Sequence, residues 1–183
     1  MKTRDLTKIA ICVALLCVSA YISIPLPFTS AMLTAQTLVV NLLALILLPK
    51  QSAIAMIVYI LIGAIGLPVF SGGGAGFGKL FGPTGGFILA FLLSAPVISY
   101  LKGKDVSFIR YCFITILIGM PIIYIGGTIS MCIVQGIDIM SALSMAVVPF
   151  ILGDILKCVA ASLIAIKMNK VLKSNNTDIK EVA

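Results

Sequence analysis

Hydrophobic segments alternate with short polar breaks along most of the chain. An α-helix needs about 20 mainly apolar residues to cross the hydrocarbon core of a bilayer, and several segments approach or exceed this length. We predict six membrane-spanning helices, over residues 9–24, 36–48, 52–65, 85–100, 111–134 and 142–166. The pattern therefore predicts an all-α, polytopic membrane protein, with a single integral-membrane domain over residues 1–183 and a Gly-rich loop between the third and fourth helices.

Composition agrees with this pattern. Of the 183 residues, 61% are hydrophobic and only 10% are charged, and the mean hydropathy is +1.21. Water-soluble domains do not have such a composition. The longest hydrophilic piece is the tail after Lys167, which is too short for a second, aqueous domain. Any ATPase that works with this protein would have to be another chain.

The basic residues predict an orientation in the membrane. A net charge of +7 would fit nucleic-acid binding, but the Lys and Arg residues lie at the ends of hydrophobic segments rather than in a patch with interleaved aromatics. With both termini cytoplasmic, the positive-inside rule places every basic residue except Lys79 and Lys157 on the cytoplasmic side. The Gly-rich loop then faces the exterior, which fits an uptake function.

The first segment, residues 9–24, has two interpretations. Lys2, Arg4 and Lys8 precede it as in a signal peptide, yet the hydrophobic segments that follow favour a retained membrane span. Ala10 and Ala14 are four residues apart and form a small-residue patch that another helix could approach closely. Ordinary packing inside the bundle is the alternative explanation of this patch.

The stretch at residues 66–87 is crowded with Gly and Pro and reads GLPVFSGGGAGFGKLFGPTGGF. A run of glycines stays irregular unless a ligand or packing orders it, and the apolar residues within it favour burial. Part of the run has the GxxxxGK spacing of a phosphate-binding P-loop, but Leu80 stands where the Mg²⁺-binding Ser or Thr would be needed. We therefore predict a lid or ligand-binding loop and not a nucleotide site.

Polar side chains inside the hydrophobic segments are the candidate ligand contacts. Gln36, Asn41 and Tyr59 need hydrogen-bond partners at membrane depth, from either a neighbouring helix or a polar substrate. Asp154 and Lys157 lie three residues apart in the last segment, so they share one helical face and can neutralise each other. The pair is a candidate binding site, and an interhelical salt bridge is the alternative.

Nothing in the sequence favours an enzyme or a metal site. The chain has no His, no GxSxG motif and no pair of aspartates on one helix. Its five cysteines lie in apolar segments without CxxC spacing, as buried structural thiols do.

Several motifs together resemble the BioY family, the biotin-binding S components of energy-coupling-factor (ECF) transporters. The resemblance covers nearly the whole chain and is most specific at the glycine block at residues 72–78 followed by GPTGG at residues 82–86. Further matches are TAQT at residues 34–37 and the segment from Pro149-Phe150 through Asp154 to Lys157. Two departures are visible. Phe87 stands where the family usually has Tyr after GPTGG, and Met32-Leu33-Thr34 replaces the usual Pro-hydrophobe-Thr. A ligand contact made by that Tyr hydroxyl would be missing here.

This resemblance implies a six-helix S component in the plasma membrane of a prokaryote, which binds biotin from the exterior. It also implies partners, namely a transmembrane coupling subunit and two ATPase subunits that use ATP, with no cofactor in this chain. The substrate-binding residues that we predict from pattern and resemblance together are Asp154, Lys157, Gln36, Thr34, Tyr59, Phe70, Gly73, Gly74, Thr84, Gly85 and Phe87.

Roles follow for three groups of residues. Ala10 and Ala14 are expected to dock the coupling subunit, and residues 70–81 to close over the ligand as a lid. Asp154 and Lys157 are expected to hold the ureido head of biotin, while a competing assignment gives Lys157 or Lys79 to its carboxylate. Two other functions remain open at this point: an S component for a different vitamin, and a structural or pore-forming membrane oligomer.

Overall fold

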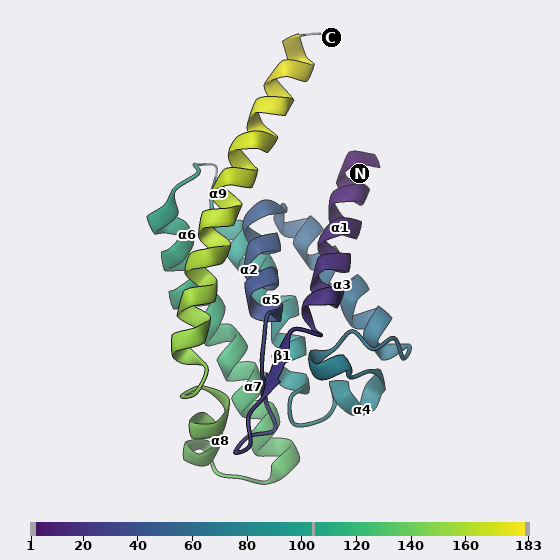
Figure 1. Cartoon of the computed structure of the whole chain (residues 1–183), viewed down its shortest axis with the longest axis vertical. Coiled ribbons are helices and arrows are strands. Elements are labelled where there is room, and N and C mark those ends of the chain that lie inside the picture. The colour runs from purple at the N-terminus through teal and green to yellow at the C-terminus, as the bar shows by residue number, and fades with distance from the viewer. Residues whose placement is uncertain (1–2, 104, 182–183) are drawn as a thin grey trace.

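The computed structural model describes residues 3–103 and 105–181, which form a helical bundle (Figure 1). Its helices are α1 (Thr3–Ser19), α2 (Gln36–Ile46), α3 (Pro49–Ala64), α4 (Gly76–Leu80), α5 (Gly85–Leu101), α6 (Phe108–Ile114), α7 (Met120–Gln135), α8 (Ile139–Ala146) and α9 (Ile151–Glu181). A 3₁₀ turn, η1 (Ser71–Gly73), and a π-helical turn, η2 (Thr115–Gly119), complete the helical elements. The predicted all-α class is thus observed as a mainly helical fold.

The two ends of the bundle differ in construction. Both chain termini lie at one end in Figure 1, beyond α1 and α9. At the other end lie α8, α4 and a short hairpin in which β1 (Ser23–Pro25) pairs antiparallel with β2 (Met32–Thr34). The hairpin was not among the predicted elements, because its strands are only three residues long and Pro25 and Pro27 lie within and just after the first of them.

The helix boundaries depart from the predicted spans at the first and last segments. The first helix ends at Ser19, before β1 begins, and not at residue 24. The last predicted span, residues 142–166, is broken into α8 and α9, which are bent by 50° at a four-residue break. Within the described part of the chain, Phe108–Gln135 is the one unbroken helix long and apolar enough to cross a membrane alone, and the bent pair would make a second. The helices α2, α3 and α5 are apolar but shorter.

The close packing of α5 against α7 depends on two glycines. A Cβ atom on Gly86 would lie 2.0 Å from the Gly126 carbonyl oxygen, and one on Gly126 would lie 2.6 Å from the Gly86 carbonyl oxygen. Small residues at such a crossing let two backbones approach closely. Next to this contact, a Cβ atom on Gly127 would overlap the Phe87 ring. The glycines of the fifth segment therefore fix where Phe87 lies.

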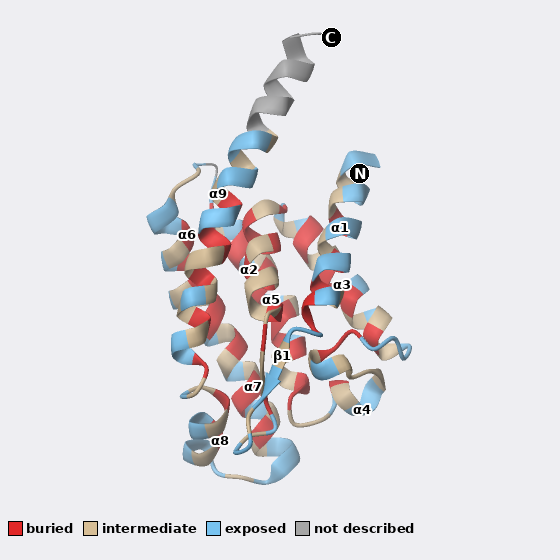
Figure 2. Ribbon diagram, viewed as in Figure 1, coloured by how far each residue is buried: buried red, intermediate tan, exposed pale blue. Residues whose placement is uncertain are grey.

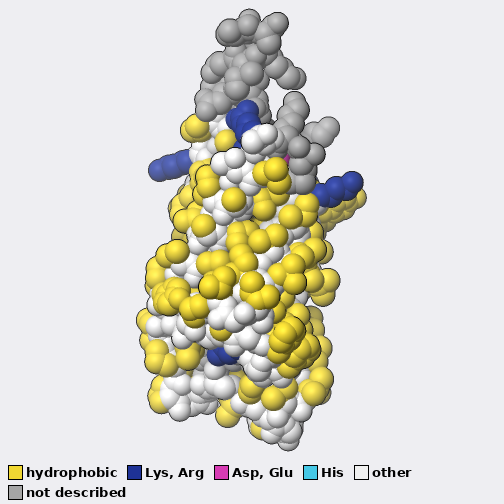
Figure 3. Space-filling model, turned by 90° about the vertical axis from the view of Figure 1, so that its right-hand side faces the viewer, with side chains coloured by type: hydrophobic (Ala, Val, Ile, Leu, Met, Phe, Trp, Pro, Cys, Tyr) yellow, Lys and Arg dark blue, Asp and Glu magenta, His cyan; other side chains and the backbone are white. Residues whose placement is uncertain are grey.

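Apolar side chains fill the core and also cover much of the outside. Buried residues line the inner faces of the helices in Figure 2, and they include Leu16, Leu45 and Ile98 at 0% exposure. Large hydrophobic side chains such as Leu93, Ile133 and Leu152 are nonetheless 65–76% exposed. Figure 3 shows hydrophobic side chains over the middle of one face, with most of its Lys and Arg near the terminal end. Such a surface suits hydrocarbon rather than water.

Candidate functional site

A cavity of about 50 Å³ lies where the hairpin, η1 and the helices α2, α5, α7 and α9 meet. Its lining combines aromatic and aliphatic side chains with polar and charged ones. This combination is typical of small-molecule sites. The lining residues are Ala31, Met32, Thr34, Gln36, Thr37, Ser71, Thr84, Phe87, Ile88, Phe91, Ile123, Tyr124, Phe150, Asp154 and Lys157.

Asp154 is the centre of a hydrogen-bonded cluster in the cavity that also contains Thr37, Tyr124 and Lys157. It lies in the first turn of α9, where the helix dipole favours an anion, and it is only 4% exposed. Its Oδ1 accepts hydrogen bonds from the Lys157 ammonium at 2.9 Å and the Thr37 hydroxyl at 3.1 Å. Its Oδ2 accepts a hydrogen bond from the Tyr124 hydroxyl at 2.9 Å. Three helices therefore hold this carboxylate in place.

Gln36 occupies the first turn of α2 beside this cluster. Its amide nitrogen donates to the Tyr59 hydroxyl at 2.6 Å and to the Val69 carbonyl at 3.3 Å, and the Tyr59 hydroxyl donates to the same carbonyl at 3.2 Å. Both donor hydrogens of the amide are used in this way. The carbonyl oxygen of Gln36 is left as the group available to a ligand.

The start of the Gly-rich loop is anchored rather than free. Phe70 is fully buried, packs edge-on against Tyr59, and occupies the space that a side chain on Gly63 would need. Gly72 and Gly73 then adopt positive φ angles of 69° and 72°, a conformation that glycine reaches without steric cost. The loop turns back sharply after Phe70 because of these two residues.

Comparisons with known proteins agree with this architecture. A sequence profile of the BioY family matches residues 1–174. The chain belongs to the BioY family. It is 41% identical over 170 residues to the biotin transporter BioY of Thermotoga maritima, which covers 91% of this chain and 96% of the relative. It is 33% identical over 179 residues to the biotin transporter BioY2 of Lactococcus lactis subsp. cremoris, which covers 96% and 95% of the two chains.

A solved structure of similar fold gives the same result. The crystal structure of an S component for biotin from an ECF-type ABC transporter matches with a TM-score of 0.84 at 25% identity. The match covers 93% of this chain and 95% of the solved one. The resemblance inferred from the sequence motifs is therefore confirmed at the level of the family.

The BioY fold brings together some of the predicted substrate-binding residues. Those that line the cavity are Thr34, Gln36, Thr84, Phe87, Asp154 and Lys157. Five others lie outside the lining: Tyr59, Phe70, Gly73, Gly74 and Gly85. Tyr59 contacts the site indirectly, as the hydrogen-bond acceptor of the Gln36 amide. Phe70 packs against Gly63 and does not reach the cavity. Gly85 lies under the Leu80 carbonyl, where no Cβ atom fits.

Three polar lining residues are not among the predicted substrate contacts: Ser71, which lies in the predicted lid, and Thr37 and Tyr124, which bind Asp154. Thr37 follows Gln36 directly, and its hydroxyl accepts a hydrogen bond from Lys157 at 3.3 Å besides donating to Asp154. Tyr124 is one of five hydroxyl residues in the fifth segment, with Tyr111, Thr115, Thr128 and Ser130. Hydroxyls at membrane depth need a partner, but the sequence does not single out Tyr124 among these five.

Four other residues singled out in the sequence lie away from the cavity. Asn41 donates to the Cys158 sulfur at 3.4 Å, which favours its interhelical interpretation. The Lys79 stem packs against Gly74, and its ammonium group does not line the cavity. Ala10 and Ala14 are exposed on α1, on a face shared with the exposed side chains of Ile11 and Leu15.

Proposed function

We propose that this chain is the biotin-binding S component of an ECF-type vitamin transporter. The observation that carries the proposal is the ion pair between buried Asp154 and partly buried Lys157, which lines a cavity of aromatic, aliphatic and polar side chains in a member of the BioY family. Such a chain acts by binding and not by catalysis. It spans the membrane of a prokaryote as one six-helix domain, and it works with a transmembrane coupling subunit and two ATPases.

We further propose that the cavity faces the exterior. Both termini lie at the end of the bundle opposite the hairpin, which fits an even number of crossings (Figure 1). The Lys and Arg residues gather near the terminal end, which is the cytoplasmic one by the positive-inside rule (Figure 3). Biotin would then enter past the hairpin and the Gly-rich loop.

The hydrogen-bonding capacity of the polar groups suits a ureido ring, which offers two N–H donors beside one carbonyl acceptor. A carboxylate has about four lone-pair sites, and Asp154 uses three, so one remains on Oδ2. The Lys157 ammonium uses two of its three donors on Asp154 and Thr37, so one remains. One ureido N–H binds Asp154, the adjacent carbonyl binds Lys157, and the second N–H binds the Gln36 carbonyl oxygen.

The cavity must widen before it holds biotin. A volume of about 50 Å³ accommodates a few waters, whereas drug-sized ligands occupy pockets of about 300–1,000 Å³. The walls on the helix side are locked by the α5–α7 crossing. The walls at the hairpin side are Ala31, Met32 and Thr34, and Ser71 comes from η1. These short irregular segments are the part of the wall that moves most easily.

Hydrogen exchange tests whether the hairpin and the Gly-rich loop close over the ligand as a lid. We expect biotin to slow amide exchange over residues 20–35 and over residues 71–81, because the two segments bind each other through the Gly72 amide and the Ala20 carbonyl. The segment at Phe108–Ile114, which forms α6 at the terminal end and does not line the cavity, is the internal control and should exchange equally with and without biotin. Unchanged exchange over both 20–35 and 71–81 in saturating biotin would remove the lid hypothesis.

A ligand panel on the purified protein tests the function itself. We expect tight, stoichiometric binding of biotin, and no measurable binding of thiamine or riboflavin at the same concentrations, by isothermal titration calorimetry in detergent. Thiamine carries a permanent cation and no ureido group, and riboflavin, which does have an N–H between two carbonyls, has a three-ring body and a polyhydroxyl chain that are much larger than the bicyclic head of biotin. Preferential binding of another vitamin would show a different S component, and binding of none would favour a structural oligomer.

A further inference from the structure

Lys102 is a buried lysine that the ligand site does not use. It follows α5 at the terminal end of the bundle and is 8% exposed. Its ammonium donates to the backbone carbonyls of Ala44 at 3.3 Å, Leu45 at 2.9 Å and Leu47 at 2.5 Å. Among the described residues, no carboxylate forms an ion pair with it. Burial lowers the pKa of Lys102 to about 8, so the group is still mainly a cation at neutral pH.

The three carbonyls are free because α2 ends there. The last carbonyls of a helix have no intrahelical partner, and Leu47 has already turned to an extended conformation. Ala44, Leu45 and Leu47 are at most 1% exposed, so water does not satisfy them. An ammonium has three donors, which matches three acceptors, and its charge is favourable at a helix C-terminus.

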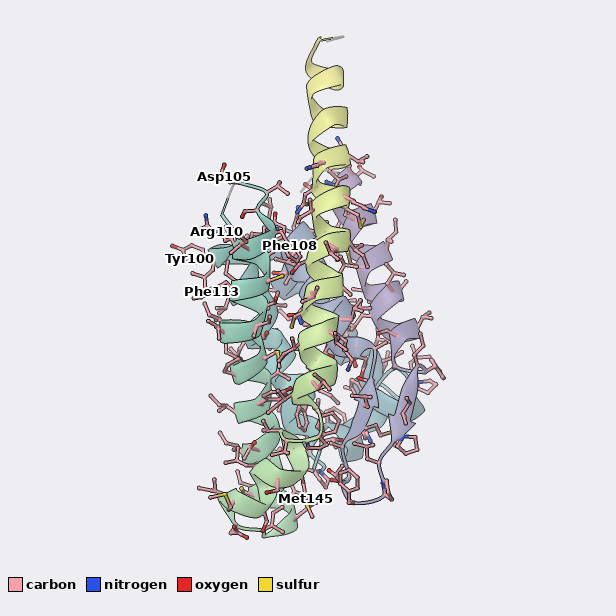
Figure 4. The ribbon with its side chains drawn as sticks, turned by 60° about the vertical axis from the view of Figure 1, so that its left-hand side comes forward. Tyr100, Asp105, Phe108, Arg110, Phe113 and Met145 are labelled. Atoms are coloured by element: carbon pink, nitrogen blue, oxygen red, sulfur yellow. The ribbon has the colours of Figure 1, made fainter. Side chains whose placement is uncertain are left out.

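Neighbouring helices complete the enclosure of these carbonyls. The Ser99 hydroxyl donates to the Leu47 carbonyl at 2.5 Å, and the Asn169 amide of α9 donates to the Leu45 carbonyl at 2.9 Å. Arg110 of α6 binds the Leu101 carbonyl through two nitrogens, at 2.9 and 3.2 Å, and so fixes the residue before Lys102. Figure 4 shows Arg110 and Phe108 at this end, far from Met145 of α8.

The other end of α2 carries the ligand site. Gln36 and Thr37 lie in its first turn and line the cavity. No side chain caps the N-terminus of α2, so that end lacks a capping contact of its own. A helix of 11 residues is a short rod, and a shift at its C-terminus moves both side chains relative to Asp154.

We propose that the carbonyls of Ala44, Leu45 and Leu47 form a cation-binding cage, that the Lys102 ammonium is its tethered ion, and that the cage sets the position of α2 and hence of Gln36 and Thr37. Lys102 is thus a positioning residue for the ligand site. Its effect on biotin rests on the proposed function, but the cage itself does not.

The test is removal of the tethered cation followed by its replacement from solution. Lys102→Met keeps the apolar stem but removes three charge-assisted hydrogen bonds, which leaves the Ala44 carbonyl unpaired and the Leu45 and Leu47 carbonyls with only Asn169 and Ser99. We therefore expect Tm in detergent to fall by roughly 5–10 °C and the Kd for biotin to rise about tenfold or more. Ammonium chloride should restore part of both losses, because the free ion fits the cage. Tetramethylammonium chloride at equal ionic strength has no N–H donors and should restore neither.

Controls separate this proposal from the biotin assignment. Lys170→Met removes an exposed lysine of α9 at the same end and should change neither value. If Lys102→Met does not fold, Lys102→Gln keeps two donors, and its Tm and biotin affinity should lie between those of wild type and complete loss.

The outcomes that contradict the proposal are distinct. Equal responses of Lys102→Met to the two salts would overturn the cage, and so would a wild-type Tm for this variant. Wild-type biotin affinity in Lys102→Met, with affinity lost in Asp154→Asn, would overturn the positioning role. Restoration of Tm by ammonium in a protein that never binds biotin would instead contradict the proposed function.

Discussion

Replacing Asp154 by asparagine is expected to weaken biotin binding by on the order of 100- to 1,000-fold while the protein stays folded in detergent. The substitution replaces one carboxylate oxygen by an amide NH₂, which cannot accept from a ureido N–H, and leaves the partly buried Lys157 ammonium without its counter-ion. Breaking a buried pair on one side costs about 3–5 kcal/mol, and each 1.4 kcal/mol is about tenfold in affinity. Calorimetric titration with biotin gives the value.

The matched control is Asp138→Asn. Asp138 also lies at the start of a helix, where its side chain accepts from the Met140 and Ser141 amides, but it is fully exposed. Asparagine caps a helix about as well as aspartate, so this variant removes one negative charge with little other effect. Binding of biotin should be unchanged.

Two further measurements decide what Asp154 binds. Biotin amide keeps the ureido ring and lacks the acid, so Asp154→Asn should lose affinity for both ligands alike if the carboxylate holds the ring. Tyr124→Phe removes one hydrogen bond to Asp154 and should weaken binding only several-fold. If Asp154→Asn binds biotin as wild type does, the Asp154–Lys157 pair is structural.

The bundle was predictable because hydrophobic length and Pro or Gly breaks are local properties of the sequence. Each of the six predicted segments is helical at its centre, although Ser19 and the 50° bend before Ile151 depart from the predicted boundaries. The bend falls at residues 147–150, where no polar break marks it in the hydropathy pattern but Pro149 does. A proline inside a helical pattern ends or kinks the helix, so this local signal was missed because hydropathy alone set the span.

The site was only partly predictable for a related reason. Asp154 and Lys157 were conspicuous because charge is costly in hydrocarbon, and this cost can be read from one segment alone. Tyr124 and Thr37 are ordinary hydroxyl residues that gain a role only because α7 and α2 meet α9. Gly73 and Gly74 are predicted to contact substrate from the motif alone, and they lie just outside the cavity lining, to which Ser71 of the same turn contributes.

The second large expected effect concerns the exposed surface of α1, where the coupling subunit is predicted to dock. Ala10 and Ala14 are both exposed and four residues apart, so they form a smooth strip on a helix whose neighbours on that face, Ile11 and Leu15, are 56% and 50% exposed. Small residues let two membrane helices approach closely, which is what a docking surface for the coupling subunit requires. Because neither side chain is in the core, larger residues there should leave the bundle intact.

Replacing both Ala10 and Ala14 by tryptophan is therefore expected to abolish co-purification with the coupling subunit and the ATPases, while the Kd for biotin stays within about twofold of wild type. Two indole rings hold a partner helix away from the α1 backbone and remove the close contact along the whole strip. The control is the same change at Ile129 and Ile133 of α7, which are also exposed and four residues apart but lie on another face. A pull-down from membranes that contain all subunits gives the comparison. If the α1 variant assembles normally and the α7 variant does not, the coupling subunit docks on α7 and the small-residue strip of α1 has no part in assembly.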